Sequence, residues 1–300
     1  MKTVLIFANP IAGQGRGKRI AESLRKILYA TGFDVRVFFD RPDDITPDAL
    51  GVGDEPPAAA ISIGGDGTLR GVVQRLMELF SPDAIPPIVV VPLGTANLMS
   101  KHLGVDWSER TLQRDLPEAI LAQRIKSLDA ATANEKLFLL MAGVGIDAQI
   151  VHELDRVRTG PIDLTSYALP AALAFQSYSY SPIEVEIDGQ KVFGPAPALA
   201  FVGNVAEYGT GFPVLPLARS DDRRLDVCVL PCASRVDLIR LALLVATGDH
   251  LRAEGVIYKT AKTIRIASAN EVPVQIDGEP GGHLPLEISM LPQQIRFLVQ

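Results

Sequence analysis

The stretch that decides the fold lies near residue 65 and reads Ile61-Ser62-Ile63-Gly64-Gly65-Asp66-Gly67-Thr68-Leu69. The apolar run that enters it, residues 58–63, is typical of a buried parallel strand. After it, apolar residues recur at helical spacing and predict an amphipathic helix: Leu69, Val72, Val73, Leu76, Met77 and Phe80. A strand, a glycine turn and a helix together present free backbone N–H groups to an anion, which indicates a nucleotide-phosphate site. An ordinary turn before a helix also uses glycine, so this stretch alone leaves both interpretations open.

The flanking sequence repeats the alternation of strands and helices. Apolar runs predict further strands at 3–8, 34–39 and 87–91, and helical patterns follow through about residues 29, 103 and 123. Such alternation predicts an α/β domain with a doubly wound parallel sheet and with ligands at the carboxyl ends of its strands.

Two more turns follow strands of this sheet. The first, residues 9–18, is rich in glycine and basic residues, but it lacks the Walker pattern because Ala12 and Arg19 replace the required glycine and hydroxyl residue. It still suits phosphate contact, although a solvated turn is the alternative. The second is Pro92-Leu93-Gly94-Thr95-Ala96-Asn97, again at a junction of strand and helix.

Strand patterns dominate the second half of the chain. We expect a strand at 137–142, a helical region at 148–180 broken by Gly160-Pro161 and Pro170, and a hairpin across Asp188-Gly189. Further strands are predicted at 198–202, 225–229, 263–267, 272–276, 286–290 and 295–299, and one helix at 236–247. The pattern predicts a mainly antiparallel β C-terminal domain. The aromatic residues of the helical region suit core packing best, with an apolar pocket or a membrane surface as alternatives: Tyr167, Phe175, Tyr178 and Tyr180.

Composition limits the classes of function. A net charge of −6 carries no general bias toward nucleic acid, and we expect no nucleic-acid partner. The only cysteines, Cys228 and Cys232, lack a second pair for a structural zinc site and are expected to be buried thiols. The first apolar run is too short for a signal-peptide core, and no apolar tract reaches the roughly 20 residues that span a bilayer. We therefore expect a cytoplasmic protein.

Four motifs occur in order along the chain, at 9–13, 64–68, 92–97 and 277–279. Together they resemble the signature of the diacylglycerol kinase catalytic-domain family. This family includes bacterial lipid kinases and sphingosine kinases, and its fold resembles that of NAD kinases. The resemblance implies an α/β nucleotide-binding domain at 1–133, to which residues 290–300 return, and a β-rich lipid-substrate domain at 134–289. It also implies transfer of the γ-phosphate of ATP to a lipid hydroxyl, with Mg²⁺.

The resemblance also implies roles for particular residues. Asp129 matches the family's catalytic aspartate, and Glu279, after Asp277-Gly278, matches its proposed general base. Nucleotide contacts are implied for Asn9, Gly64, Gly65, Asp66, Gly67, Thr68, Gly94, Thr95 and Asn97. Metal binding is implied for Asp66 at the nucleotide, and for Asp222 with the carbonyl groups of Arg219 and Arg224 in a structural-magnesium loop.

The chain departs from the family pattern in four places. Arg70-Gly71 replaces Asn-Glu, Leu98 replaces an aspartate, Arg223 replaces a glycine, and Asp40-Arg41 stands where a threonine is common. These departures motivate one alternative to a lipid kinase, a non-catalytic member that binds nucleotide or lipid. The other alternative is an NAD-kinase-like enzyme of the same superfamily. The expected partners are ATP and a lipid substrate reached by peripheral membrane contact, and a homodimer is among the open oligomeric states.

Overall fold

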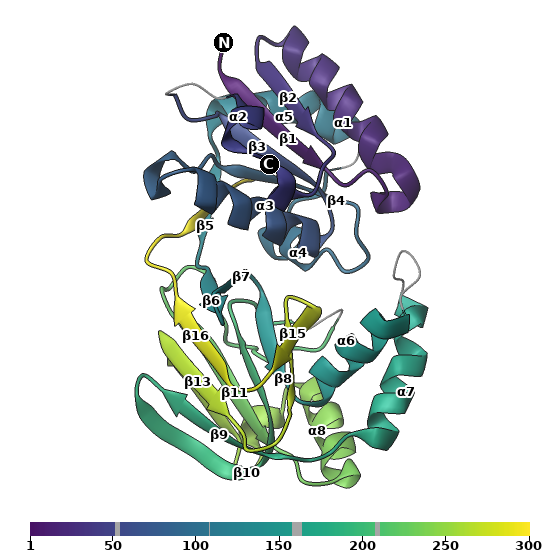
Figure 1. Ribbon diagram of the computed structural model, residues 1–300, viewed down its shortest axis with the longest axis vertical. Coiled ribbons are helices and arrows are strands. Elements are labelled where there is room, and N and C mark those ends of the chain that lie inside the picture. Colours follow the sequence, from purple (N-terminus) through teal and green to yellow (C-terminus); the bar gives the residue numbers. More distant parts are fainter. Residues whose placement is uncertain (52–54, 108, 158–163, 208–210) are drawn as a thin grey trace. The chain divides into compact units, whose positions relative to one another are not determined.

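The computed structural model describes residues 1–51, 55–107, 109–157, 164–207 and 211–300 (Figure 1). The chain divides into two compact units. Unit 1 comprises Met1–Leu128 with Gln293–Gln300, and unit 2 comprises Asp129–Pro292. Residues 129–133, which the resemblance places in the first domain, pack in unit 2, and the segment that returns to unit 1 begins at Gln293.

Unit 1 is built on a six-stranded sheet in the order β2-β1-β3-β4-β17-β5. The first four strands run parallel, β17 is parallel to β4, and β5 is antiparallel to β17. Its strands are β1 (Thr3–Ala8), β2 (Asp34–Phe38), β3 (Ala59–Gly64), β4 (Ile88–Pro92), β5 (Ile125–Leu128) and β17 (Ile295–Leu298). Its helices are α1 (Ala12–Ala30), α2 (Pro47–Leu50), α3 (Asp66–Leu79), α4 (Leu98–Leu103) and α5 (Glu109–Ala122), with short 3-10 turns η1 (Pro42–Asp44) and η2 (Pro82–Ala84).

The strand order of unit 1 reverses between β1 and β3. The chain leaves β1 toward β2 and leaves β3 in the opposite direction toward β4, so right-handed crossovers place α1 and α3 on opposite faces of the sheet. This confirms the doubly wound expectation. The residues of β3 are buried throughout, as expected for a parallel strand covered on both faces. On α3, four of the six predicted apolar positions are buried, namely Leu69, Val72, Val73 and Leu76.

Unit 2 is an antiparallel β structure whose longest strand, β10 (Gln190–Gly203), links two groups of strands. The first half of β10 pairs with β9 (Pro182–Ile187), and its second half pairs with β8 (Met141–Val144) and β11 (Leu225–Pro231). The other strands are β6 (Ala131–Ala133), β7 (Lys136–Phe138), β12 (Ile257–Ala261), β13 (Thr263–Ala267), β14 (Pro273–Ile276), β15 (Glu279–His283) and β16 (Leu286–Met290). The helices are α6 (Ile146–Val157), α7 (Ala168–Ser177) and α8 (Arg235–Thr247), with η3 (Leu164–Tyr167) and η4 (His250–Arg252). The mainly antiparallel expectation is confirmed.

Alternating side chains build the core of unit 2. On β9 the residues Ile183, Val185 and Ile187 point inward and are buried, and β13 and β16 follow the same period of two. Both cysteines are buried free thiols, as expected.

Three sequence expectations for unit 2 were wrong in detail. The single strand expected at 137–142 is two strands, β7 and β8, because the Asp277 carboxylate binds the backbone N–H groups between them. Pro170 does not break a helix but lies in the first turn of α7, where its missing N–H costs nothing. Strands β6, β12 and β15 were missed, and the sequence of β15 does not resemble a strand because it contains Pro280 and two glycines. The expected break at Gly160-Pro161 lies outside the described residues.

The bend in β10 requires glycine at residue 194. The register of β10 with β9 shifts between Lys191 and Phe193 and again between Phe193 and Ala196. Gly194 lies in the second interval and has a φ of +87°. A Cβ at this position would lie 2.0 Å from the Ile183 carbonyl oxygen, so a side chain would push β9 and β10 apart.

We predict that Gly194→Ala destabilises the protein more than Gly189→Ala. Gly189 has a φ of +77°, and no atom lies within 4 Å of the place that a Cβ would take, so alanine there costs only the left-handed backbone, about 1–2 kcal/mol. Gly194→Ala adds the steric clash, about 1–3 kcal/mol more. Urea unfolding of both variants measures the difference. Equal losses would contradict the role given to Gly194.

Candidate functional site

Three turns of unit 1 meet at one edge of its sheet. They follow β1, β3 and β4, which are neighbours in the sheet, and they begin at Asn9, Gly65 and Leu93. Backbone hydrogen bonds join them: Asn9 N–H donates to the Ile63 carbonyl at 3.0 Å, and Leu93 N–H donates to the Gly64 carbonyl at 2.8 Å. This edge is also where the strand order reverses, the usual place for a ligand in an open α/β sheet.

The turns after β3 and β4 touch through glycine backbones. A Cβ built on Gly94 would lie 2.7 Å from the Cα of Gly65 and 2.9 Å from the Asn97 Oδ1. The two turns can approach this closely only because neither residue has a side chain. Gly94 and Thr95 are exposed, whereas Gly65, Gly67 and Thr68 are half-buried. The contact therefore leaves a backbone surface open to a ligand.

Two polar side chains hold the turn after β4. The Asn97 side chain accepts a hydrogen bond from Gly94 N–H at 2.8 Å and donates to the Gly94 carbonyl at 2.7 Å. The Asp66 carboxylate accepts from Leu98 N–H at 2.9 Å and from Met99 N–H at 3.1 Å. Burial raises the pKa of Asp66, and these amides oppose the rise. Asp66 thus ties the start of α3 to the start of α4, and its proposed metal role stays a prediction.

The turn after β1 has an unusual backbone. Gly13, Gln14 and Gly15 have φ values of +58°, +61° and +85°, so the regular part of α1 begins after them. The Asn9 Oδ1 accepts from Ile11 N–H at 3.1 Å, and Arg16 Nε donates to the Gly13 carbonyl at 3.0 Å. The sequence predicted a glycine-rich turn here, but not this left-handed path.

In unit 2, Asp129 is buried, with 2% of its surface exposed. Its carboxylate Oδ2 accepts from Arg223 N–H at 2.6 Å, and its own N–H donates to the Ser220 carbonyl at 2.6 Å. The loop that carries the predicted structural-magnesium residues is therefore bound directly to the predicted catalytic aspartate.

Arg223 adopts a backbone conformation that favours glycine. Its φ is +64°, in the left-handed region that favours glycine, and its guanidinium donates to the Pro292 carbonyl. Arg223 therefore takes the left-handed backbone without being glycine, and its side chain connects the loop to residue 292.

The same loop contains an acid that sequence reasoning missed. Asp226 is buried, and its Oδ2 has no hydrogen-bond partner among the described residues. Burial raises its pKa, and the nearby Asp222 carboxylate adds to the rise. Asp222 is exposed and accepts from Arg224 N–H at 3.0 Å, while Arg219 pairs with Asp221 at 3.5 Å. In the described part of the chain, no three side chains of His, Cys, Asp or Glu gather in a way that would hold a metal ion.

Asp277 shapes the turn that carries Glu279. Its two carboxylate oxygens accept from the N–H groups of Leu139, Leu140 and Met141 at 2.9, 2.9 and 3.1 Å. Both Asp277 and Gly278 have positive φ, which places Glu279 at the first position of β15. In the sequence Asp277 is only part of a motif, whereas in the structure it anchors the turn.

Asn204 connects this turn to Asp129. Its Nδ2 donates to the Asp129 carbonyl at 2.9 Å and to the Leu139 carbonyl at 3.3 Å, and Leu139 N–H binds Asp277. The structure thus links Asp129 by hydrogen bonds to the turn that carries Glu279, although the two predicted catalytic residues are far apart in the sequence. Sequence reasoning missed Asn204 because it belongs to no motif.

Two buried side chains, Gln275 and Asp147, support the turn that carries Glu279. Gln275, which is fully buried, accepts from Gly278 N–H at 2.9 Å and donates to the Asp147 Oδ2 at 3.3 Å. Burial raises the pKa of Asp147 to about 7, and its Oδ1 has no hydrogen-bond partner among the described residues. Asp147 lies in the 143–148 segment, which formally matches a dinucleotide fingerprint but occurs outside a βαβ unit.

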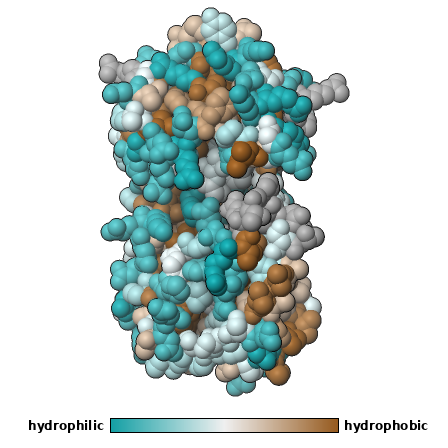
Figure 2. Space-filling model, turned by 45° about the vertical axis from the view of Figure 1, so that its right-hand side comes forward, coloured by the Kyte–Doolittle hydropathy of each residue, from teal (hydrophilic) through white to brown (hydrophobic). Residues whose placement is uncertain are grey.

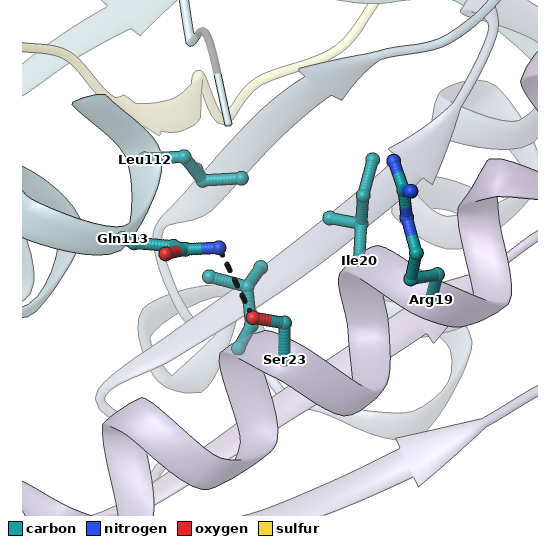
Figure 3. Close-up of a pocket in the computed structure, with 6 residues that line it drawn as sticks. Arg19, Ile20, Ser23, Leu112 and Gln113 are labelled. Carbon is teal, nitrogen blue, oxygen red and sulfur yellow. Dashed lines mark hydrogen bonds between the residues drawn. The ribbon is translucent and has the colours of Figure 1, made fainter. Parts of the chain in front are cut away.

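A separate hollow of about 200 Å³ lies between α1 and α5 in unit 1 (Figure 3). There Gln113 Nε2 donates to Ser23 Oγ at 3.1 Å. The lining residues are Arg19, Ile20, Ser23, Leu24, Leu112 and Gln113. None of the predicted site residues lines this hollow. Among the described helices, none is long and apolar enough to cross a membrane.

Comparison with known proteins gives two family matches. Residues 3–133 match the diacylglycerol kinase catalytic domain, and residues 141–299 match the YegS C-terminal NAD kinase beta sandwich-like domain. These matches confirm the resemblance stated from the motifs.

Similar proteins cover the whole chain at low identity. A protein of Staphylococcus carnosus named diacylglycerol kinase is 26% identical over 98% of this chain and 94% of its own length. One of Bacillus subtilis with the same name is 25% identical over 100% of this chain and 97% of its own length.

Solved structures support the fold. A putative diacylglycerol kinase from Bacillus anthracis superposes with a TM-score of 0.73 at 23% identity, covering 100% of this chain and 95% of its own. An NAD kinase from Archaeoglobus fulgidus in complex with ATP gives a TM-score of 0.54 at 14% identity, covering 99% and 93%.

We predict that Asp147 makes stability depend on pH. Its pKa rises from 3.8 to about 7 on folding. At pH values between these two, the carboxyl group is therefore protonated in the folded state and ionised in the unfolded state. The stabilisation is present below about pH 4 and is lost as pH rises through 7, on the order of 2 kcal/mol between pH 5 and 8. Asp147→Asn should flatten this dependence in urea unfolding. Asp155→Asn, an exposed position on the same helix, is the control. An unchanged pH profile in Asp147→Asn would refute the prediction.

Proposed function

The chain belongs to the diacylglycerol kinase catalytic-domain family, and we propose that it is an ATP-dependent lipid kinase that transfers the γ-phosphate of ATP to a hydroxyl of diacylglycerol or a related lipid. The observation that carries this proposal is the meeting of three turns between strands and helices at the switch point of the unit 1 sheet. Phosphoryl transfer depends mainly on positioning and on neutralising charge, and exposed backbone N–H groups suit both tasks.

In unit 1, the turns supply the proposed nucleotide contacts. The amides at 64–68 and that of Thr95 would donate to phosphate oxygens, and Asn9 and Asn97 would keep the turns in place. The departures at Arg70 and Leu98 change side chains and leave this backbone in place. At residue 98, for example, the backbone N–H donates to Asp66, so this hydrogen bond does not depend on the side chain there. This argues for retained nucleotide binding.

In unit 2, Glu279 is the proposed general base. Its carboxylate would accept the proton of the lipid hydroxyl while that oxygen bonds to the γ-phosphorus and the bond from phosphorus to the bridging oxygen of ADP breaks. Asp129, linked to the same turn through Asn204, is the proposed second catalytic carboxylate. Gln275 and Asp147 would be positioning residues, because they act on the backbone of the turn.

The family also implies magnesium. The 219–226 loop offers oxygen donors that suit such an ion, and the unpartnered buried oxygen of Asp226 fits an additional ligand beside Asp222. A separate magnesium ion, bound with the nucleotide near Asp66, would neutralise phosphate charge.

An NAD-kinase-like activity is the second candidate, favoured by the structural similarity to an archaeal NAD kinase. Incubation with γ-labelled ATP and diacylglycerol, a sphingoid base or NAD separates the candidates. We expect label in the diacylglycerol. Label in NAD alone would overturn the lipid kinase proposal, and no transfer to any acceptor in the presence of bound ATP would favour a non-catalytic member.

We predict that Glu279→Gln lowers kcat by about 100-fold or more, the usual effect of losing a general base, while ATP affinity stays near wild type. Steady-state kinetics with varied ATP and lipid measures both quantities. Glu254→Gln, at an exposed position of the same unit, should leave kcat unchanged. A Glu279→Gln enzyme with wild-type kcat would remove Glu279 from the mechanism.

A further inference from the structure

Helix α8 exposes its apolar side chains instead of burying them. Val236, Ile239 and Leu243 are 75%, 51% and 65% exposed, and their spacing places them on one stripe of the helix. Only Leu241 and Val245 of α8 are buried, and they lie on the opposite side of the helix, which packs against the rest of unit 2. An exposed stripe of this kind on a soluble domain indicates an interaction surface.

The stripe borders a shallow hollow of about 400 Å³. Its lining is formed by residues of α8 alone: Val236, Ile239, Arg240, Leu243 and Leu244. Figure 2 shows apolar side chains gathered in the lower part of the picture, on the part of unit 2 that carries α7 and α8.

Helix α7 extends this surface. Leu169, Leu173 and Phe175 are exposed on it, and its ten residues include no charged side chain. The two helices are joined by Arg235, whose guanidinium lies 6.0 Å from the Phe175 ring centroid and donates to the Gln176 carbonyl at 2.5 Å. We call the surface formed by Phe175, Val236, Ile239 and Leu243 the α7–α8 face.

Arginines outnumber acids among the charged residues of α8 beside the α7–α8 face. Arg235 and Arg240 are exposed on α8. The one acid of the helix, Asp237, is engaged at its N-terminus, where its carboxylate accepts from Ala233 N–H at 3.0 Å and from Ser234 Oγ at 2.8 Å. The chain as a whole is acidic, with a net charge of −6, so this local excess of arginine runs against the overall charge.

We propose that the α7–α8 face docks on an anionic lipid surface. Apolar side chains flanked by arginines match such a surface, because the side chains enter the acyl boundary while the guanidinium groups meet anionic headgroups. A second copy of the chain fits less well, since a symmetric contact through α8 would bring the arginines of both copies together. The inference rests on the proposed function, in which the acceptor resides in a membrane, and it identifies the surface that meets that membrane.

Sedimentation with vesicles tests the proposal without using catalysis. The wild-type chain should bind vesicles of equal phosphatidylglycerol and phosphatidylcholine more tightly than vesicles of phosphatidylcholine alone. Ile239→Ser/Leu243→Ser should weaken binding by about a hundredfold, because each large apolar side chain lost from the acyl boundary costs roughly tenfold. Arg240→Gln should weaken binding to the anionic vesicles by about fivefold and leave binding to neutral vesicles unchanged.

Leu121→Ser is the matched control, because Leu121 is also 65% exposed on a helix but lies in unit 1. It should bind vesicles as wild type does. Wild-type vesicle binding by the Ile239→Ser/Leu243→Ser variant would overturn the proposal, as would a loss of self-association in that variant with no change in vesicle binding.

Kinase activity on a water-soluble, short-chain diacylglycerol separates this proposal from the proposed function. The α8 variants should retain that activity. If wild type phosphorylates the short-chain lipid but binds no anionic vesicle, the docking surface is wrong and the kinase proposal stands. If wild type binds vesicles through α8 but phosphorylates no lipid, the reverse holds.

Discussion

The close contact between Gly65 and Gly94 is the constraint on which unit 1 depends. It brings the turns after two neighbouring parallel strands within backbone contact, and it occurs beside the point where the strand order reverses. Around it, the side chains of Asp66 and Asn97 bind backbone groups and hold the turns, so the surface left for a ligand consists largely of backbone. A ligand surface made of backbone depends little on neighbouring side chains, so the geometry of these turns is compatible with Arg70 and Leu98.

Unit 2 uses carboxylates in a similar way. Asp277 binds three consecutive N–H groups, and Asp129 binds the N–H of Arg223. Asn204 and Gln275 connect these points, so the turn that carries Glu279 is fixed from several directions. Catalytic groups need such support, because small displacements cost large factors in rate. The network holds Asp129 and the turn that carries Glu279 in defined positions. It also includes Asp147, whose pKa is raised by burial, so we expect the stability of the protein to depend on pH.

Much of the fold follows from local patterns in the sequence. The strand at Thr3–Ala8 and the junction at 59–66 are predictable because a buried parallel strand is a nearly continuous apolar run, and the second of these runs ends at glycine. What local patterns miss are contacts between distant residues. The division of 137–142 into two strands depends on Asp277, about 140 residues away, and the cap that Asp66 provides for α4 depends on the folded position of both turns. Arg223 is a further case, since a left-handed arginine is not expected from its residue type. Motif order therefore located the candidate residues, and the structure supplied the contacts that hold them.

The central claim is that the three turns of unit 1 bind the phosphates of ATP. Hydrogen–deuterium exchange with and without ATP and magnesium tests it most directly, because bound phosphate oxygens should protect the amides that they contact. We predict slower exchange at residues 9–17, 64–68 and 94–97. Saturating ATP that leaves exchange at all three turns unchanged, with binding verified by calorimetry, would contradict the account.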